Sequence, residues 1–288
     1  MRIMRIIGVV AATAAILTLA AQFHGTRARL VSVVQAQSGC SNSSLRGTYG
    51  FQIKGTIVGL GPIAGVARLI FDGAGNFTQT DNVTVNGFPI VPNRPGSGTY
   101  NVNADCTGTQ TLNTGGQVLH TTFVLAENRK EVFDVVTDPN LVITGVGKAV
   151  NLVDDNEDDD SSPFGCSLTT IRGAYATSTT GSIIFAGPVG AVADVGKITF
   201  YGNGGVSQTS AVSLNGVIIP NRSSLSGSYT MNRDCTGDIS LVLPGPSGTI
   251  TSSSHLVLVH NGEELLTINT GVGRVLPGIA TRQHPRLW

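Results

Sequence analysis

The sequence predicts an all-β protein made of two tandem antiparallel barrels, each with eight strands. Three observations favour this fold class. Apolar and polar residues alternate with the period of a strand, and beyond the N-terminal region no segment keeps a helical period. The 37 Gly and 12 Pro of the 288-residue chain gather in short turn-like segments between these runs. A set of motifs also occurs twice in the same order, which indicates an internal duplication.

The first 36 residues are predicted to be a secretory signal peptide. Arg2 and Arg5 form its basic start, and residues 6–21 form an apolar run of about sixteen residues, short for a spanning helix. Cleavage is expected after Ala36, with Ala21 as the alternative site and an uncleaved anchor as a further alternative. We therefore expect a secreted protein, periplasmic or extracellular, with no membrane span after cleavage.

Each half of the remaining chain has eight expected strands. In the first strand Tyr49, Phe51 and Ile53 share one face, and in the third strand Gln79 and Asp81 lie among apolar residues on one face. The expected strands of the first half are 47–56, 65–71, 77–85, 98–102, 107–112, 118–126, 131–136 and 141–150. Those of the second half are 173–179, 191–200, 206–214, 228–231, 239–243, 249–259, 263–269 and 271–276.

A closed barrel removes the exposed sheet edges that a secreted protein would otherwise present. The alternative is a pair of β-sandwiches, which usually have a central Trp, whereas the one Trp here is Trp288 at the tail.

The duplication divides the chain into segments. The motif at 40–49 returns at 166–175, an offset of 126 residues, and Asp-Cys-Thr-Gly at 105–108 returns at 234–237, an offset of 129. We interpret the acidic stretch between the copies as a solvated linker, because its spacing does not fit an EF-hand calcium loop. The expected organisation is a signal peptide at 1–36, repeat 1 at 40–150, a linker at 151–163, repeat 2 at 164–276 and a C-terminal tail at 277–288.

Each repeat has two cysteines at matching places, which selects one of the three possible pairings. We predict the disulfides Cys40–Cys106 and Cys166–Cys235, as expected for an exported protein. Four free buried thiols are the alternative.

The motifs of repeat 1 resemble a module of secreted bacterial proteins of unassigned function. The residues concerned are Cys40 with RGTYGF at 46–51, FDGAGN at 71–76 and GTYNVNADCTGT at 98–109. The resemblance covers nearly the whole mature chain and implies export and a β fold, without an activity. Repeat 2 departs from the pattern at Ala174, 201–205 and 230–233. The Gly-x-Tyr opening at 47–49 is also similar to the Gly-x-Trp opening of lipocalin-like calycins.

Composition and motifs exclude several function classes. Leaving out four basic residues of the N-terminal region and six acidic residues of the linker reduces 18 and 18 to 14 and 12, so no basic surface for nucleic acid is expected. The histidines lack metal-ligand spacing, and no Gly-x-Ser-x-Gly nucleophile motif occurs. We expect Asp105 and Asp234 to stabilise turns, and we expect no metal and no cofactor.

Polar residues on the expected interior faces are the candidate ligand-binding residues. They are Tyr49, Gln79, Asp81, Tyr100, Tyr175, Gln208, Ser210 and Tyr229. An eight-stranded barrel is either filled by side chains or holds one small ligand. The expected function is therefore non-enzymatic, with a small hydrophobic molecule as the partner, or structural or adhesive if the barrels are filled.

A barrel enzyme of the isomerase or cyclase kind is a second alternative. It would use Asp81 or the tyrosines, and because Ser210 replaces Asp81 in repeat 2, at most one repeat would be active. The duplicated cations, Arg46 with Arg172 and Arg94 with Arg222, are expected to be structural. Arg94 is expected in a loop.

Overall fold

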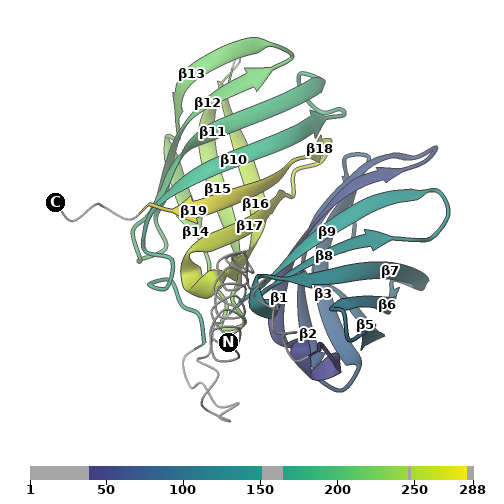
Figure 1. Cartoon of the computed structure of the whole chain (residues 1–288). Coiled ribbons are helices and arrows are strands. Elements are labelled where there is room, and N and C mark those ends of the chain that lie inside the picture. Colours follow the sequence, from purple (N-terminus) through teal and green to yellow (C-terminus); the bar gives the residue numbers. More distant parts are fainter. Residues whose placement is uncertain (1–38, 151–164, 246–247, 284–288) are drawn as a thin grey trace, which may run out of the picture. The chain divides into compact units, whose positions relative to one another are not determined.

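The structure, a computed structural model, describes residues 39–150, 165–245 and 248–283 (Figure 1). In these ranges the chain forms strands and three short 3-10 helices, which confirms the predicted all-β class. The strands of one sheet, sheet A, come from residues 46–149, and those of sheet B from residues 173–282. The predicted signal peptide and linker, and the last five residues of the predicted tail, lie outside the described residues.

Sheet A is a closed antiparallel barrel of eight strands, which we call barrel A. Its strand order is β2-β1-β9-β8-β7-β6-β5-β3, and β2 also pairs with β3, so the ring closes. The prediction of an eight-stranded barrel is thus confirmed here, and the sandwich is excluded. The strands are β1 (Arg46–Ile57), β2 (Gly61–Asp72), β3 (Asn76–Val85), β4 (Phe88–Pro89), β5 (Arg94–Val102), β6 (Thr107–Thr114), β7 (Gln117–Ala126), β8 (Glu131–Val136) and β9 (Leu141–Ala149). The short β4 pairs with β3 outside the ring.

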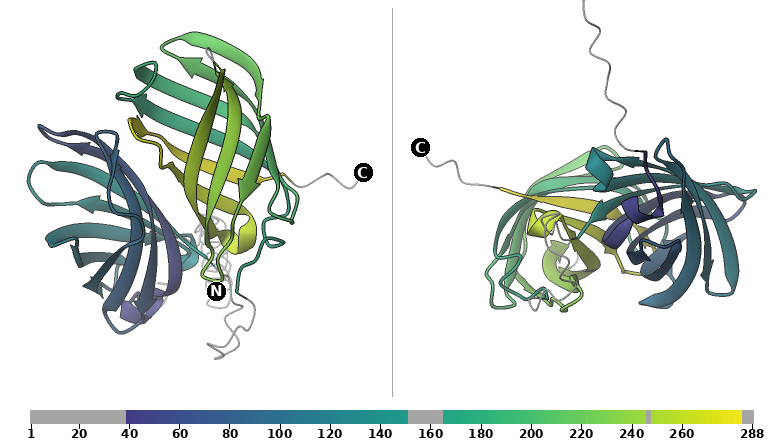
Figure 2. Two further views of the ribbon diagram at one scale, coloured as in Figure 1. Left: turned by 180° about the vertical axis from the view of Figure 1, so that it is seen from behind. Right: turned by 60° about the horizontal axis from the view of Figure 1, so that its bottom comes forward.

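Sheet B has the same antiparallel winding but does not close. Its order is β13-β12-β11-β10-β19-β17-β16-β15-β14, with β18 beside β10. The sheet curls into an incomplete barrel, a correction to the second closed barrel predicted from the sequence, and Figure 2 shows both sheets from two further sides. The strands are β10 (Gly173–Ile183), β11 (Gly190–Phe200), β12 (Val206–Leu214), β13 (Val217–Ser223), β14 (Ser226–Tyr229), β15 (Thr236–Gly245), β16 (Gly248–Val259), β17 (Glu264–Asn269), β18 (Arg274–Val275) and β19 (Pro277–Arg282).

The two sheets differ at one seam. In barrel A, β5 pairs with β3 from Asn76↔Thr99 to Asp81↔Arg94, which closes the ring. In sheet B the corresponding part of the chain changes partner: β13 pairs with β12, after which Leu225 N–H donates to the Val242 carbonyl and β14 pairs with β15. Across this seam the described residues form the isolated bridge Gly205↔Ser228 and a hydrogen bond of 2.8 Å from Tyr229 N–H to the Gly204 carbonyl, in place of a paired strand.

The end of sheet B also corrects the sequence prediction. Residues 277–282 were predicted in the tail, but they form β19, which lies between β10 and β17. The predicted strand 271–276 is reduced to the two residues of β18. Gly273 has a φ of 81°, which interrupts the extended chain, and Pro277 stands at the first position of β19, where a strand tolerates proline.

Aromatic rings fill one end of each interior. In barrel A the Phe71 ring centroid lies 5.6 Å from that of Tyr49 and 5.2 Å from that of Tyr100, both edge-to-face. In sheet B the Phe200 centroid lies 5.5 Å from Tyr175 and 4.9 Å from Tyr229. Edge-to-face ring pairs stabilise the fold beyond the burial of their apolar surface. The aromatic end of each interior is therefore filled by packed side chains.

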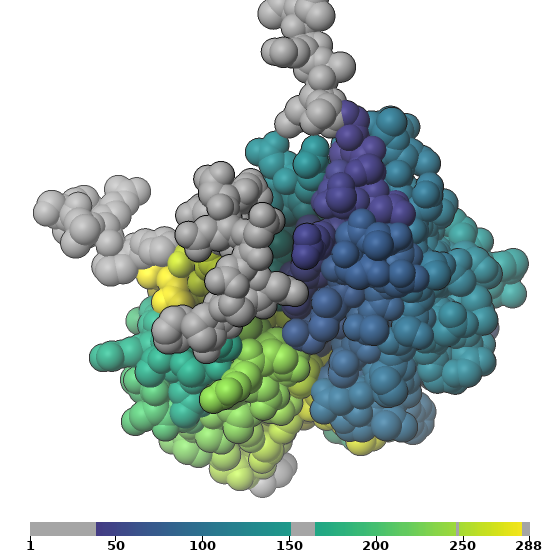
Figure 3. Space-filling model, turned by 90° about the horizontal axis from the view of Figure 1, so that it is seen from below, coloured from purple at the N-terminus to yellow at the C-terminus, as the bar shows by residue number. Residues whose placement is uncertain are grey.

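The segment before β1 covers the aromatic end of barrel A. It contains the 3-10 helix η1 (Asn42–Ser44) and the fully buried Leu45. The Tyr100 hydroxyl donates to the Leu45 carbonyl over 2.7 Å, and Val102 N–H donates to Asn42 Oδ1 over 2.7 Å. Seen from below in Figure 3, this first described segment (purple) lies against the blue strands of barrel A.

The disulfide prediction is confirmed. Cys40 is bonded to Cys106 and Cys166 to Cys235. The adjoining turns also follow the prediction, because Asp105 Oδ1 accepts the N–H of Thr107 and Asp234 Oδ1 that of Thr236, both over 3.1 Å. Two disulfides indicate a non-reducing environment.

The described residues after position 38 belong to one compact unit, Gly39–Trp288. Within it, Gln52 Nε2 donates to the Gly278 carbonyl of β19 over 2.8 Å, and Lys148 Nζ lies 2.8 Å from Glu264 Oε2 of β17. None of the helices in the described ranges has the length and apolar character needed to cross a membrane.

Candidate functional site

Barrel A contains a cavity of about 400 Å³. Its wall is mostly aliphatic, with contributions from strands all round the ring. Representative lining residues are Ile53, Leu69, Val83, Leu112, Leu119 and Ile143. The cavity lies beyond the aromatic rings, where the inward positions of the strands carry smaller side chains.

At the inward-facing Gly147, an aromatic ring takes up the space that a side chain would otherwise fill. A Cβ built on Gly147 would collide with the Phe51 ring, so the ring occupies the space of the missing side chain and lies against the wall. A bulky residue in that place would push the ring toward the cavity. The volume of the lumen therefore depends on positions where a large side chain on one strand packs against a glycine on the neighbouring strand.

A buried ion pair lies at the β3–β5 seam. Arg94 Nε and Nη2 donate to Asp81 Oδ1 and Oδ2 over 3.0 and 2.8 Å, and Gln79 Nε2 donates to Oδ2 over 2.6 Å. The side chain of Asp81 is 2% exposed and that of Arg94 is 19% exposed. Two-point contact of this kind is strong and fixes geometry. Both carboxylate oxygens of Asp81 are therefore already engaged, which disfavours Asp81 as an acid or base.

The position of Arg94 differs from the sequence prediction. It is not in a loop but is the first residue of β5, and its side chain lines the cavity. The alternation of Arg94, Gly96, Gly98 and Tyr100 on one face is the signal that indicates this strand. Pro95 argued against a strand at this point, because proline is uncommon inside strands.

Asp134 is a cavity residue that the sequence analysis did not select. It lies on β8 between Val132 and Val136, which share its inward face, and opposite Gly145 of β9. A Cβ at Gly145 would collide with the carboxylate, so this glycine makes room for it. Burial raises the pKa of Asp134 to about 6, and a hydrogen bond from the Gly145 backbone only partly opposes this rise. Of the charged residues that line the cavity, Asp81 and Arg94 pair with each other, and Asp134 has no cationic partner in the part of the chain that the structure describes.

Thr121 adds a second polar group to the same wall. Its side chain lines the cavity, and its buried Oγ1 has no hydrogen-bond partner among the described residues. On β7, Phe123 is the direct partner of Asp134 and Thr121 is the partner of Val136. Thr121 and Asp134 are thus diagonal neighbours on the inward face, a separation that long or polar side chains can bridge.

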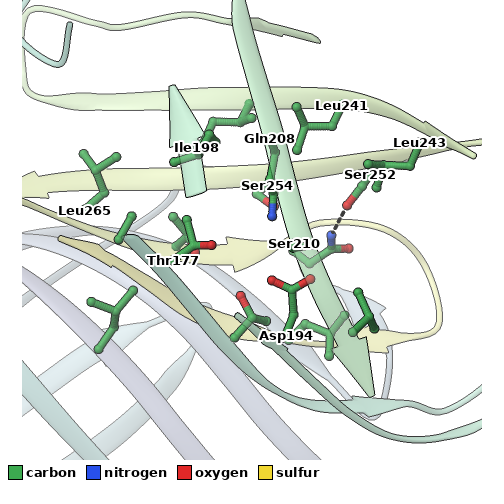
Figure 4. Close-up of a pocket in the computed structure, with 18 of the residues that line it drawn as sticks. Thr177, Asp194, Ile198, Gln208, Ser210, Leu241, Leu243, Ser252, Ser254 and Leu265 are labelled. Carbon is green, nitrogen blue, oxygen red and sulfur yellow. Dashed lines mark hydrogen bonds between the residues drawn. The ribbon is translucent and has the colours of Figure 1, made fainter. Parts of the chain in front are cut away.

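Sheet B encloses a smaller cavity of about 150 Å³ (Figure 4). Leu241, Leu243 and Leu265 are among the residues that line it, as the close-up shows. At the offset of 129 residues, Gln110 and Thr114 of barrel A correspond to Ile239 and Leu243. Larger side chains therefore fill space that is open in barrel A.

The acid in this second cavity has partners. Burial raises the pKa of Asp194, while a hydrogen bond from Ser210 and the charge of Arg222 act in the opposite direction. Of the predicted residues, Gln208 and Ser210 line this cavity, as Gln79 and Asp81 line that of barrel A.

The four predicted tyrosines do not line either cavity. Their hydroxyl groups donate to backbone carbonyls: Tyr49 to Arg129, Tyr100 to Leu45, Tyr175 to Gly262 and Tyr229 to Leu168, over 2.6 to 2.7 Å. Burial raises the pKa of Tyr49 and of Tyr175 to about 12. They therefore hold the aromatic ends together and lie outside the two cavities.

The described ranges hold no group of three or more His, Cys, Asp or Glu side chains arranged to bind a metal ion. Comparison of the chain with models of known protein families and with curated proteins finds no match.

Proposed function

We propose that this is a secreted, non-enzymatic binding protein that holds one small, largely apolar molecule in the lumen of barrel A. The observation that carries the proposal is the cavity of about 400 Å³ with its aliphatic wall. Cavities of this size and character, with a few polar groups, are typical of small-molecule sites. The non-reducing environment indicated by the disulfides agrees with secretion.

The polar groups of the lumen support binding more than catalysis. Asp81 is held by Arg94 and Gln79, and Thr121 Oγ1 makes no hydrogen bond to any described residue, Asp134 included, so no base is positioned to activate it. A general acid or base must be within hydrogen-bond reach of the proton that it transfers. Asp134 and Thr121 both line the lumen, where a carboxyl and a hydroxyl group suit recognition of a bound molecule.

Sheet B has a different proposed role. Its cavity has about 150 Å³, and its acid already has hydrogen-bond and charge partners. We propose that sheet B is a structural element. The structural alternative then applies to sheet B, and the ligand-binding alternative applies to barrel A.

Filling the cavity tests the proposal. Leu119→Trp places a large ring in the lumen, whereas Val118→Trp places the same ring on the outer face of the same strand, where Val118 is 52% exposed. The probe is N-phenyl-1-naphthylamine, a neutral fluorophore whose emission rises in apolar surroundings. We expect the wild-type protein and Val118→Trp to bind it alike and Leu119→Trp to bind it at least about tenfold more weakly. Failure of the wild-type protein to bind, or equal affinities in the two variants, would contradict the proposal.

A further inference from the structure

We infer that the molecule bound in barrel A carries a basic nitrogen, and that its ammonium group lies between the Asp134 carboxylate and the Thr121 hydroxyl. This inference deepens the proposed function and rests on it. It identifies the ligand class as an apolar body, aromatic or aliphatic, with a single amine.

The first step is the charge balance of the lumen. Asp81 and Arg94 form a two-point ion pair and neutralise each other. Asp134 lines the same cavity without a cation among the described residues. A carboxylate in an apolar wall is costly unless a cation pairs with it or a proton neutralises it. A ligand that brings a cation supplies the missing partner.

The second step is the hydrogen-bond balance of the same wall. Thr121 Oγ1 is buried and without a partner, and it lies diagonally across the β7–β8 pair from Asp134. An alkylammonium group has three donors, as lysine does, so it can donate to both oxygens at once. An alcohol would satisfy the hydroxyl but leave the carboxylate uncompensated. The pair of groups therefore selects an amine over an alcohol.

The third step is the dependence on pH. The residues that face Asp134 from the neighbouring strands do not titrate: Thr121 and Phe123 on β7, and Ile143 and Gly145 on β9. The other charged groups of the cavity are Asp81 and Arg94, which are paired. Because the pKa of Asp134 is about 6, the carboxylate is ionised at pH 8 and mostly protonated at pH 5. An amine stays protonated at both pH values, so its affinity should fall about tenfold at pH 5.

A matched pair of ligands tests this inference. 1-Naphthylmethylamine and 1-naphthalenemethanol share one apolar body and differ in the amine and the hydroxyl. Their affinities are measured by calorimetry at pH 8 and pH 5. The wild-type protein should prefer the amine at least about tenfold at pH 8 and lose most of this preference at pH 5. Asp134→Asn should bind the two ligands equally, and the matched control Asp138→Asn, with the same charge change outside the cavity, should behave as wild type.

A second variant separates the two contacts. Thr121→Val removes the hydroxyl and keeps the charge, so amine affinity should fall severalfold at pH 8 while its dependence on pH remains. Binding of the alcohol by Asp134→Asn shows that this variant is folded. Equal affinity of the wild-type protein for the two ligands, or an amine preference that survives in Asp134→Asn, would overturn the inference and leave the proposed function standing. Absence of binding of both ligands and of the neutral fluorophore would instead overturn the proposed function.

Discussion

At the scale of single residues, Asp134 is a carboxyl group in the lumen of barrel A whose ionised form is disfavoured by burial. Its carboxylate occupies space that exists only because Gly145 has no side chain, and its surroundings disfavour its charge. Asp138, four residues along the chain, is the opposite case. Hydrogen bonds from the His120 side chain and backbone lower the pKa of Asp138, so its ionised form is favoured in the fold.

Asp134→Asn should therefore stabilise the protein without ligand at neutral and alkaline pH. The pKa of Asp134 is about 6 in the fold, against about 3.9 in an unfolded chain. Because the folded state binds the proton more tightly, the contribution of Asp134 to stability is fully present below pH 4 and is lost as pH rises through 6. We expect Asp134→Asn to exceed wild type by about 2 to 3 kcal/mol in the free energy of unfolding at pH 8, and hardly at all at pH 4.

Urea-induced unfolding of both proteins at the two pH values measures this difference. Asp138→Asn is the contrast, since it should lower stability at pH 8 and have a smaller effect at low pH. A difference between Asp134→Asn and wild type that does not change with pH would show that burial of the carboxyl is not its cause.

At the scale of strands, the seam between the third and fifth strands of barrel A distinguishes the two sheets. β5 runs along β3 as far as the Asp81–Arg94 pair, so hydrogen bonds and an ion pair both hold the ring closed. In sheet B the backbone pairing changes from β12 to β15 at Leu225, so β13 and β14 are the two edge strands of the sheet. Unpaired edges open more easily than paired ones.

Native-state hydrogen exchange should reveal this difference. We expect amides of the edge strands β13 and β14 to exchange on average at least about tenfold faster than amides of β3 and β5, because β3 and β5 have paired strands on both sides. The comparison uses one sample and one temperature. Equal protection along the two seams would mean that sheet B closes in solution.

At the scale of the whole molecule, each disulfide joins the segment before the first strand of a sheet to a turn on the far side of that sheet. The bonded residues are 66 and 69 positions apart, so each bond closes a long loop. In the chain-entropy model a loop of this length contributes about 4 kcal/mol to stability. The bond at Cys40 also holds the segment with Leu45 over the aromatic end of barrel A.

Replacing Cys40 and Cys106 together by Ser should therefore lower the free energy of unfolding by about 2 to 5 kcal/mol. Denaturant-induced unfolding, with the neutral fluorophore as a reporter of barrel A, measures the effect. The matched variant with Cys166→Ser and Cys235→Ser should lose similar stability but keep the fluorophore bound in dilute denaturant. If the denaturant midpoint of the Cys40/Cys106 variant equals that of wild type, the Cys40–Cys106 disulfide does not contribute to stability.

The all-β class, the up-and-down winding, the two disulfides and the Asp-Cys-Thr-Gly turns could all be predicted from the amino-acid sequence. These features follow from local alternation, turn residues and matched cysteines, which act over a few residues or are covalent. The sequence also placed Gln79, Asp81, Gln208 and Ser210 on inward faces, because a period of two separates the faces of a strand. It assigned Tyr49, Tyr100, Tyr175 and Tyr229 to the same site, since alternation does not tell how far along a barrel a side chain lies.

That one sheet closes into a ring and the other stays open follows from the folded arrangement, because closure depends on pairing between strands that local patterns do not specify. The folded arrangement also decided the size of each lumen, which is what remains after side chains from eight strands have packed. The meeting of Asp134 with Thr121 has the same origin. Neither residue stands out in the sequence pattern of its own strand, and the register between β7 and β8 makes the two residues neighbours.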